Sequence, residues 1–243
     1  MCVVYNVFRF VSPTPDSHRT RLAVLDRFKA AVTAVWPGCR VDTFGSFATG
    51  LYLPTSDLDL VIFGRWPTVP FQSLKNILLP LAAHNSIEII DSAVVPIVRY
   101  DDSVTGVKVD ISFNNVSGTQ SAEVIKAFKL QFPELAPLIS VLKQFLVERD
   151  LATVYTGEDT ILHAVVICLL TASGGLSSYS LTLMVVSFLQ LHARPATANL
   201  GVLLLEFLEL YGRNFNYDSL TISVRDVGLF LAAKAAPISR NVR

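Results

Sequence analysis

Three aspartates stand where strands would bring them together. Asp57 and Asp59 are separated by one residue in the segment Asp57–Phe63, whose alternation of polar and apolar residues predicts a strand. At a rise of about 3.3 Å per residue, their side chains leave one face of that strand roughly 7 Å apart. Asp110 lies on the polar face of a second alternating segment, Val107–Phe113. If the two strands are neighbours, three carboxylates converge.

Converging carboxylates repel one another unless a cation neutralises them. Mg²⁺ prefers carboxylate oxygens together with substrate phosphates, and Mn²⁺ accepts the same ligands. Two such cations can lower the pKa of an attacking hydroxyl and hold a triphosphate, as phosphoryl transfer requires. The other interpretation is that Asp57 and Asp59 form the solvent face of a half-buried strand, and the D-x-D pattern by itself does not decide between the two.

Gly45 and Ser46 precede the D-x-D pattern by ten residues. Glycine permits a close backbone approach, and a serine hydroxyl with the following N–H groups can hold phosphate at the start of a helix. An ordinary turn between a strand and a helix also contains these residue types. The ordered set of G-S, D-x-D and a later aspartate is more specific than any of its parts, and it favours phosphoryl transfer.

The first half of the chain is expected to mix helices and strands around these residues. An amphipathic helix is predicted over Ser17–Val35, capped by Asp16 or Ser17 and ended by Pro37-Gly38. Besides the two aspartate strands, the pattern predicts strands at Arg40–Phe44, Ile87–Ile90 and Val94–Val98, and a short helix or loop at Phe47–Leu53.

After Asn115 the pattern becomes helical. Helices are predicted at Gln120–Leu130, Ala136–Arg149, Ser180–Leu191 and Leu200–Arg213. The fold class is therefore α+β, and we expect a lead-in at residues 1–16, a catalytic domain at 17–117 and a helical domain at 118–243.

The composition is that of a globular chain. Of its 243 residues 51% are hydrophobic and 16% charged, which excludes a disordered tail. Lys+Arg and Asp+Glu balance at 20 each, so a nucleic acid would have to be held by a local patch, an active site or another protein. Three widely spaced cysteines predict neither disulfides nor a zinc site, which favours a reducing compartment.

We expect no membrane segment. The most apolar stretches, Ile161–Leu170 and Leu181–Leu191, are each about half of the ~20 residues that a spanning helix needs. The N-terminus lacks the basic region, apolar run and cleavage site of a signal peptide.

The segment Thr43–Gly64 resembles the signature of the non-canonical poly(A) polymerases, the catalytic subunit type of the nuclear TRAMP complex, in the DNA polymerase β superfamily of nucleotidyltransferases. Val107–Asn114 (VKVDISFN) resembles the third-aspartate strand of that family. Shorter matches follow at Leu142–Leu146, Ser178–Leu181, Ser187–His192 and Tyr211–Tyr217. The resemblance implies a polymerase β-like nucleotidyltransferase lobe, with a mixed sheet and helices, followed by a mostly helical poly(A) polymerase-associated lobe.

The resemblance also implies roles for particular residues. Asp57, Asp59 and Asp110 would bind the metals and be catalytic, with Asp110 also activating the RNA 3′-hydroxyl. The other implied nucleotide contacts are Gly45 and Ser46 at the triphosphate, Asn114 at the ribose, Gly118 and Ala122 near the nucleotide, Lys143 and Ser178 at phosphate, and Tyr179 stacked on the base. Without the resemblance, Lys143 reads as a solvated helix residue and Tyr179 as a core or boundary aromatic.

The implied activity is template-independent addition of adenylates from ATP to RNA 3′ ends, with Mg²⁺ or Mn²⁺ and release of pyrophosphate. The setting would be nuclear RNA polyadenylation, surveillance and decay, in the nucleus or nucleolus. An RNA-binding zinc-knuckle protein and an RNA helicase would be partners. The alternatives are a terminal uridylyltransferase, a small-molecule nucleotidyltransferase and a non-catalytic scaffold of the same fold.

Two segments depart from the family pattern. Glu158–Gly174 is apolar and extra, between the Gly157 and Ser178 positions, and we hypothesise that it is a short intron translated in error. Leu220–Arg243 resembles only the beginning of the family's last stretch, so we expect a truncated helical lobe.

Overall fold

The computed structural model describes residues 3–91, 95–148, 177–192, 199–217, 219–224 and 229–232. The suspected extra segment Glu158–Gly174 lies outside them. The chain divides into two compact units, Phe10–Leu130 and Met1–Arg9 with Gln131–Arg243. The first unit therefore extends past the domain boundary expected at residues 117 and 118, and our division into domains stays a prediction.

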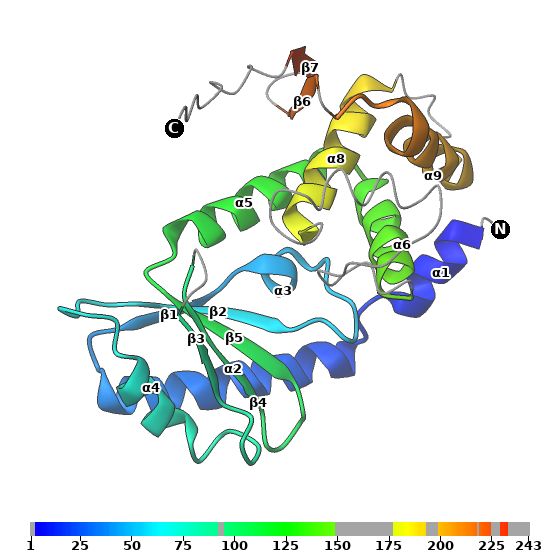
Figure 1. The fold of residues 1–243 in the computed structure, drawn as a ribbon. Helices are drawn as coiled ribbons and strands as arrows, with labels where there is room; N and C mark the ends of the chain where they lie inside the picture. Colours follow the sequence, from blue (N-terminus) through cyan, green and yellow to red (C-terminus); the bar gives the residue numbers. More distant parts are fainter. Residues whose placement is uncertain are drawn as a thin grey trace, which may run out of the picture. The chain divides into compact units, whose positions relative to one another are not determined.

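The first unit is built on a mixed sheet. Its strands are β1 (Arg40–Thr43), β2 (Leu58–Phe63), β3 (Glu88–Ile90), β4 (Ile97–Asp101) and β5 (Lys108–Phe113), in the order β1-β2-β5-β4-β3 (Figure 1). β2 and β5 run parallel, and the other neighbouring pairs are antiparallel. The mixed sheet with helices that we expected is confirmed.

Helices α2 (Pro15–Val35) and α4 (Phe71–Leu78) complete the core of this unit, α3 (Gly45–Thr49) adds Phe47 to it, and α5 (Val116–Gln131) follows β5. Phe28 and Val32 of α2 and Leu74 of α4 are fully buried against the apolar face of the sheet. That face carries the alternating residues of the strands, such as Leu60 and Ile111. The polar residues between them, including the aspartates, must therefore project from the opposite face.

Several boundaries differ from our expectations, among them the cap of α2 and the start of β4. Thr14 caps α2 in place of Asp16 or Ser17, because its side-chain oxygen accepts from the backbone N–H of Ser17 at 3.1 Å. β4 begins at Ile97 rather than Val94, which lies outside the described residues. Proline at position 96 has no N–H to donate to a ladder, so the strand forms only after it.

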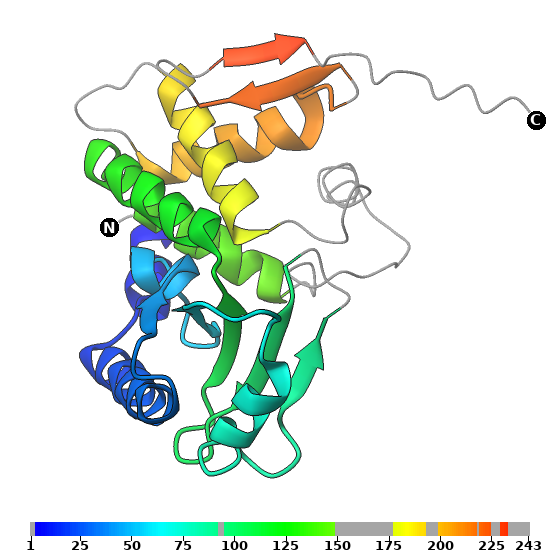
Figure 2. The same ribbon diagram turned by 90° about the vertical axis from the view of Figure 1, so that its left-hand side faces the viewer.

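The second unit is mostly helical. It contains most of α1 (Val3–Val11), then α6 (Leu135–Glu148), α8 (Ser178–Leu191), α9 (Leu200–Glu209) and the π-helical turn η1 (Leu210–Asn214), followed by a hairpin of β6 (Leu220–Ser223) and β7 (Leu229–Ala232) (Figure 2). Helix α1 and the hairpin were not predicted. Among the described residues, no helix has both the length and the apolar character needed to cross a membrane.

Candidate active site

The three aspartates lie on or next to two neighbouring strands of the sheet. The parallel register of β2 and β5 places Asp59 directly opposite Asp110, and Asp57 immediately precedes β2. The two strands are therefore neighbours, as the convergence of the carboxylates required. The Asp110 side chain is only 14% exposed, and Asp57 and Asp59 are half-buried.

Gly45 lies against Asp59, and Ser46 follows it in the chain. Gly45 has a φ of +62°, and a Cβ atom placed on it would come within 2.1 Å of the Oδ2 atom of Asp59. The N–H of Phe44, one residue earlier, donates to the carbonyl of Asp59 at 3.1 Å. Gly45 and Ser46 belong to the first turn of α3, which starts at Gly45 rather than Phe47. Only glycine fits here, because a side chain would occupy the place of the carboxylate.

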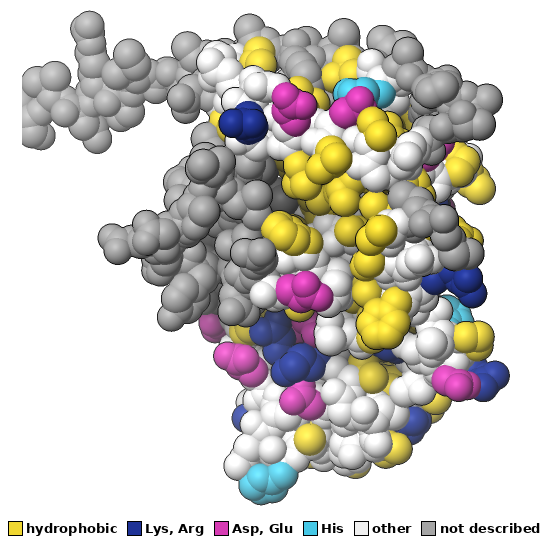
Figure 3. Space-filling model, turned by 90° about the vertical axis from the view of Figure 1, so that its right-hand side faces the viewer, with side chains coloured by type: hydrophobic (Ala, Val, Ile, Leu, Met, Phe, Trp, Pro, Cys, Tyr) yellow, Lys and Arg dark blue, Asp and Glu magenta, His cyan; other side chains and the backbone are white. Residues whose placement is uncertain are grey.

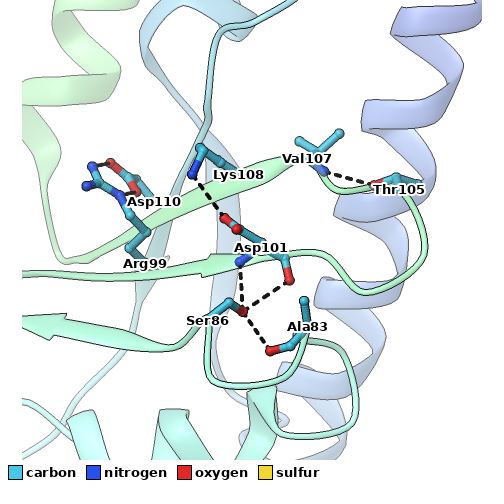
Figure 4. A network of polar contacts seen from close by, with 8 residues as sticks. All are labelled: Ala83, Ser86, Arg99, Asp101, Thr105, Val107, Lys108 and Asp110. Atoms are coloured by element: carbon cyan, nitrogen blue, oxygen red, sulfur yellow. Dashed lines mark hydrogen bonds and ion pairs between the residues drawn. The ribbon is translucent and has the colours of Figure 1, made fainter.

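Arg99 is the site residue that the sequence analysis missed. It stands opposite Asp110 on β4. Its Nε donates to Oδ1 of Asp110 and its Nη2 to Oδ2, both at 2.7 Å (Figure 4). The predicted strand ended at Val98, three residues before the end of β4, and so left Arg99 out. The signal was present, because buried Val98 and Tyr100 flank Arg99 and place it on the polar face.

A second ion pair lies on the same face. The Nζ of Lys108 is 3.5 Å from Oδ1 of Asp101, two register positions further along β4 and β5 (Figure 4). A space-filling view shows acidic and basic side chains side by side on one face of the molecule (Figure 3). The acidic cluster is thus flanked by cationic side chains that come from the sheet itself.

The electrostatics of the cluster fit a cation. Burial raises the pKa of Asp57, and the negative charge of Asp110 raises it further, while Arg99 and Lys108 offset part of the effect. Carboxylate oxygens are the donors that Mg²⁺ and Mn²⁺ prefer. In the described part of the chain, however, no three Asp, Glu, His or Cys side chains are gathered into a ready metal cage. Both Asp110 oxygens bond Arg99 instead.

Three further predicted residues belong to the same unit. Asn114 has a φ of +51°, and its side-chain amide accepts from the N–H of Gly64 and donates to the carbonyl of Gly64. Gly118 packs against the ring of Phe44, and Ala122 is buried in α5. Asn114 thus joins the ends of β2 and β5, and the nucleotide contacts expected of the three stay predictions.

Three others belong to the second unit. Lys143 of α6 is 8% exposed, which contradicts the interpretation as a solvated helix residue. Ser178 is the first residue of α8, whose cap is Ser177. Tyr179 is 40% exposed, which excludes the core position but not the boundary position that the sequence also allowed. Their contacts with a nucleotide stay predictions.

The opposite end of β2 holds a cavity of about 830 Å³. Trp36, Trp66 and Asn114 are among the residues that line it, together with Phe63 and Gly64 at the strand end. None of the three aspartates lines it, so the acidic cluster and this cavity are separate features of the same sheet.

Comparisons with known proteins agree with this geometry. Residues 3–130 match the family model described as poly(A) RNA polymerase, mitochondrial-like, central palm domain. Residues 199–241 match that of the Cid1 family poly A polymerases. The polymerase core of TRAMP, an RNA surveillance complex, superposes with a TM-score of 0.77 at 29% identity, over 94% of this chain and 69% of that one.

Two curated relatives cover most of the chain. The poly(A) RNA polymerase cid14 of Schizosaccharomyces pombe is 40% identical over 93% of this chain and 32% of its own length. The inactive non-canonical poly(A) RNA polymerase protein Trf4-2 of Drosophila melanogaster is 38% identical over 91% of this chain and 53% of its own. The chain thus spans about a third to a half of these relatives. It belongs to the family of non-canonical poly(A) RNA polymerases.

Proposed function

We propose that the chain carries the catalytic centre of a template-independent RNA nucleotidyltransferase that adds adenylates from ATP to RNA 3′ ends. The observation that carries this proposal is the parallel register of β2 and β5. It sets Asp59 opposite Asp110, and Asp57 comes immediately before β2. In the reaction the RNA 3′-oxygen bonds to the α-phosphorus of ATP. The bond from that phosphorus to the bridging oxygen breaks, and pyrophosphate leaves.

Each residue of the first unit has a role in this proposal. Asp57, Asp59 and Asp110 hold Mg²⁺ or Mn²⁺, and Asp110 also accepts the proton of the 3′-hydroxyl. Bound divalent cations supply neutralisation of the triphosphate and lower the pKa of the attacking hydroxyl. Gly45 and Ser46 hold the triphosphate next to Asp59, where the absence of a side chain on Gly45 leaves room for a close backbone approach.

The remaining nucleotide contacts follow the family pattern. Asn114 is proposed at the ribose, Gly118 and Ala122 near the nucleotide, Lys143 and Ser178 at phosphate, and Tyr179 on the base. The burial of Lys143 fits a phosphate contact, because a nearby anion offsets the cost of removing the ammonium group from water. The exposure of Tyr179 supports its role, because an exposed ring offers a face for stacking.

The balanced charge of the chain supports a division of labour with partners. We propose that an RNA-binding zinc-knuckle protein and an RNA helicase deliver the RNA, and that the protein works in the nucleus. The likeness to the polymerase core of an RNA surveillance complex supports this setting.

A second candidate is a scaffold that keeps the fold without the chemistry. The 38%-identical relative described as inactive favours it. The retention of Asp57, Asp59 and Asp110 favours the enzyme. A terminal uridylyltransferase differs from the main proposal only in its choice of nucleotide.

The test is extension of a short RNA with a free 3′-hydroxyl, in Mg²⁺ with each NTP separately. The unchanged chain is compared with Asp57→Ala, with the matched control Asp101→Ala, and with a variant that lacks Glu158–Gly174. Asp101 lies on the same face but pairs with Lys108. We expect extension with ATP that is lost in Asp57→Ala and kept in Asp101→Ala.

Each other outcome has a meaning of its own. Extension with UTP in preference to ATP would establish the uridylyltransferase. Metal-dependent nucleotide binding without extension, in both the full chain and the shortened variant, would establish the scaffold. Extension only after removal of Glu158–Gly174 would mark that segment as foreign to the enzyme.

A further inference from the structure

Arg99 holds the aspartate that the proposed reaction needs most. Its two bonds to Asp110 use both carboxylate oxygens in the fork geometry that makes such pairs strong. Each oxygen keeps a further lone pair, but a guanidinium charge at 2.7 Å opposes the arrival of a second cation. A metal ion therefore competes with Arg99 for Asp110.

Glu88 offers Arg99 a second partner. It stands opposite Arg99 on β3, so the two side chains project from the same face of the sheet. Glu88 is exposed, and in the described ranges its side chain makes neither a hydrogen bond nor an ion pair. Its charge nevertheless acts on Arg99 and helps to raise the pKa of that guanidinium, after the larger effect of the hydrogen bonds that Arg99 donates to Asp110.

Arg99 thus lies between two carboxylates in one cross-strand row. The row runs from Asp59 on β2 to Asp110 on β5, Arg99 on β4 and Glu88 on β3. A long side chain in the middle of such a row can reach either neighbour, because directly opposed Cβ atoms are only about 5 Å apart.

We propose that Arg99 is a positioning residue with two partners. It holds Asp110 before a divalent cation binds, and it turns to Glu88 when the cation takes Asp110. The exchange sets the metal concentration at which the site loads. It also explains why Asp59 and Asp110 stand opposite each other and yet no ready metal cage forms among the described side chains. This inference rests on the proposed metal role of Asp57, Asp59 and Asp110.

The test is a titration of the full chain with Mn²⁺, followed by the electron paramagnetic resonance signal of the free ion, without RNA or nucleotide. We expect Arg99→Gln to tighten the Mn²⁺ dissociation constant about tenfold, since the competing charge-assisted pair is removed. We expect Glu88→Gln to weaken it about threefold, since Arg99 loses its second partner. The metal concentration for half-maximal RNA extension should shift in the same directions.

Two matched control variants separate the effect of the Arg99 ion pairs from the general electrostatic effect of charges on this face. Lys108→Gln and Asp101→Asn remove one positive and one negative charge from the same face, but they touch a different ion pair. Each should change the dissociation constant by about twofold or less, because partly exposed charges act weakly at that distance. Arg99→Lys keeps the charge but not the fork, and we expect about threefold tighter binding. It serves as the test if Arg99→Gln fails to fold.

The outcomes distinguish failure of the proposed metal site from failure of the proposed Arg99 exchange. If the unchanged chain binds no Mn²⁺, the metal site itself is wrong, and this inference goes with it. If the chain binds Mn²⁺ but Arg99→Gln binds no more tightly than Lys108→Gln, Arg99 does not compete for Asp110. If Glu88→Gln matches Asp101→Asn, Glu88 is not the second partner and the exchange is rejected.

Discussion

Each end of β2 lies beside a glycine whose missing side chain leaves room for another group, but the two groups differ. At the first end, Gly45 leaves room for the carboxylate of Asp59, whose Oδ2 would lie 2.1 Å from an added Cβ. At the other end, Gly64 leaves room for the ring of Trp66, which would lie 2.3 Å from an added Cβ. Gly45 thus makes room for a carboxylate, and Gly64 makes room for an aromatic ring.

The difference separates chemistry from stability. At the acidic end, the pKa of Asp57 is raised by burial and by Asp110, so the folded chain holds charges that are unfavourable without a cation. At the aromatic end, Trp66 packs edge-on against Trp36 and Phe113, with ring centroids 5.3 and 5.4 Å apart. We therefore expect changes at the first end to affect activity and changes at the second to affect the free energy of unfolding.

Asp59→Asn should give the largest loss of activity with the least change in stability. It keeps the shape of the side chain but removes a proposed metal ligand, so RNA extension should fall on the order of a thousandfold. Thermal unfolding should be nearly unchanged. A parallel loss of secondary structure by circular dichroism would mean that Asp59 serves the fold and that the comparison fails.

Gly45→Ala should damage both properties. The added methyl group meets Asp59 at a φ of +62°, so extension should fall about a hundredfold as the carboxylate is displaced. Gly106→Ala is the matched control, because Gly106 has a φ of +68° and open space around its Cβ position. It should cost only the backbone strain, about 1 kcal/mol in a denaturant titration. Equal effects of the two changes on extension would contradict the close approach of Asp59.

Trp66→Ala should affect stability alone. Its ring is half-buried and packs on two other aromatic rings. We expect a loss of about 2 kcal/mol in the free energy of unfolding, below the range for a fully buried tryptophan. Mn²⁺ binding and extension by the folded protein should persist. A loss of metal binding at full folding would show that the two ends of β2 are coupled.

The smallest effects should appear in the pH dependence of stability. The pKa of Asp57 is raised in the folded chain, so its ionisation destabilises the metal-free protein as the pH rises from the ordinary carboxyl pKa of 3.8 through the higher folded value. Asp57→Asn should therefore raise the melting temperature at neutral pH and lose that advantage in acid. A melting temperature below that of the unchanged chain at pH 7 would contradict this sign.

The pKa shift of Asp102 is opposite in sign to that of Asp57. Burial raises its pKa, but hydrogen bonds from Arg27 and Thr105 outweigh burial, and the net pKa is lowered. Its contribution to stability is complete above the ordinary carboxyl pKa of 3.8 and is lost as the pH falls through the lower folded value. Asp102→Asn should therefore destabilise the protein at neutral pH and should flatten the acid limb of the stability curve.

Sequence reasoning succeeded where a pattern is local. Alternation predicted the strands of Asp59 and Asp110, and helical spacing predicted α2, α6 and α8. It failed where a boundary depends on one residue. A strand end placed at Val98 instead of Asp101 hid Arg99, although the proline before the strand could have corrected the start.

By itself, the sequence determined which residues can do chemistry, because residue type and the twofold period of a strand place Asp57 and Asp59 on one face. Only the tertiary structure decided their surroundings. The pairing of β2 with β5 and of β5 with β4 joins segments distant in sequence, and it places Asp110 between Asp59 and Arg99. A local pattern cannot specify such pairings, because register follows from how the whole sheet buries its apolar face.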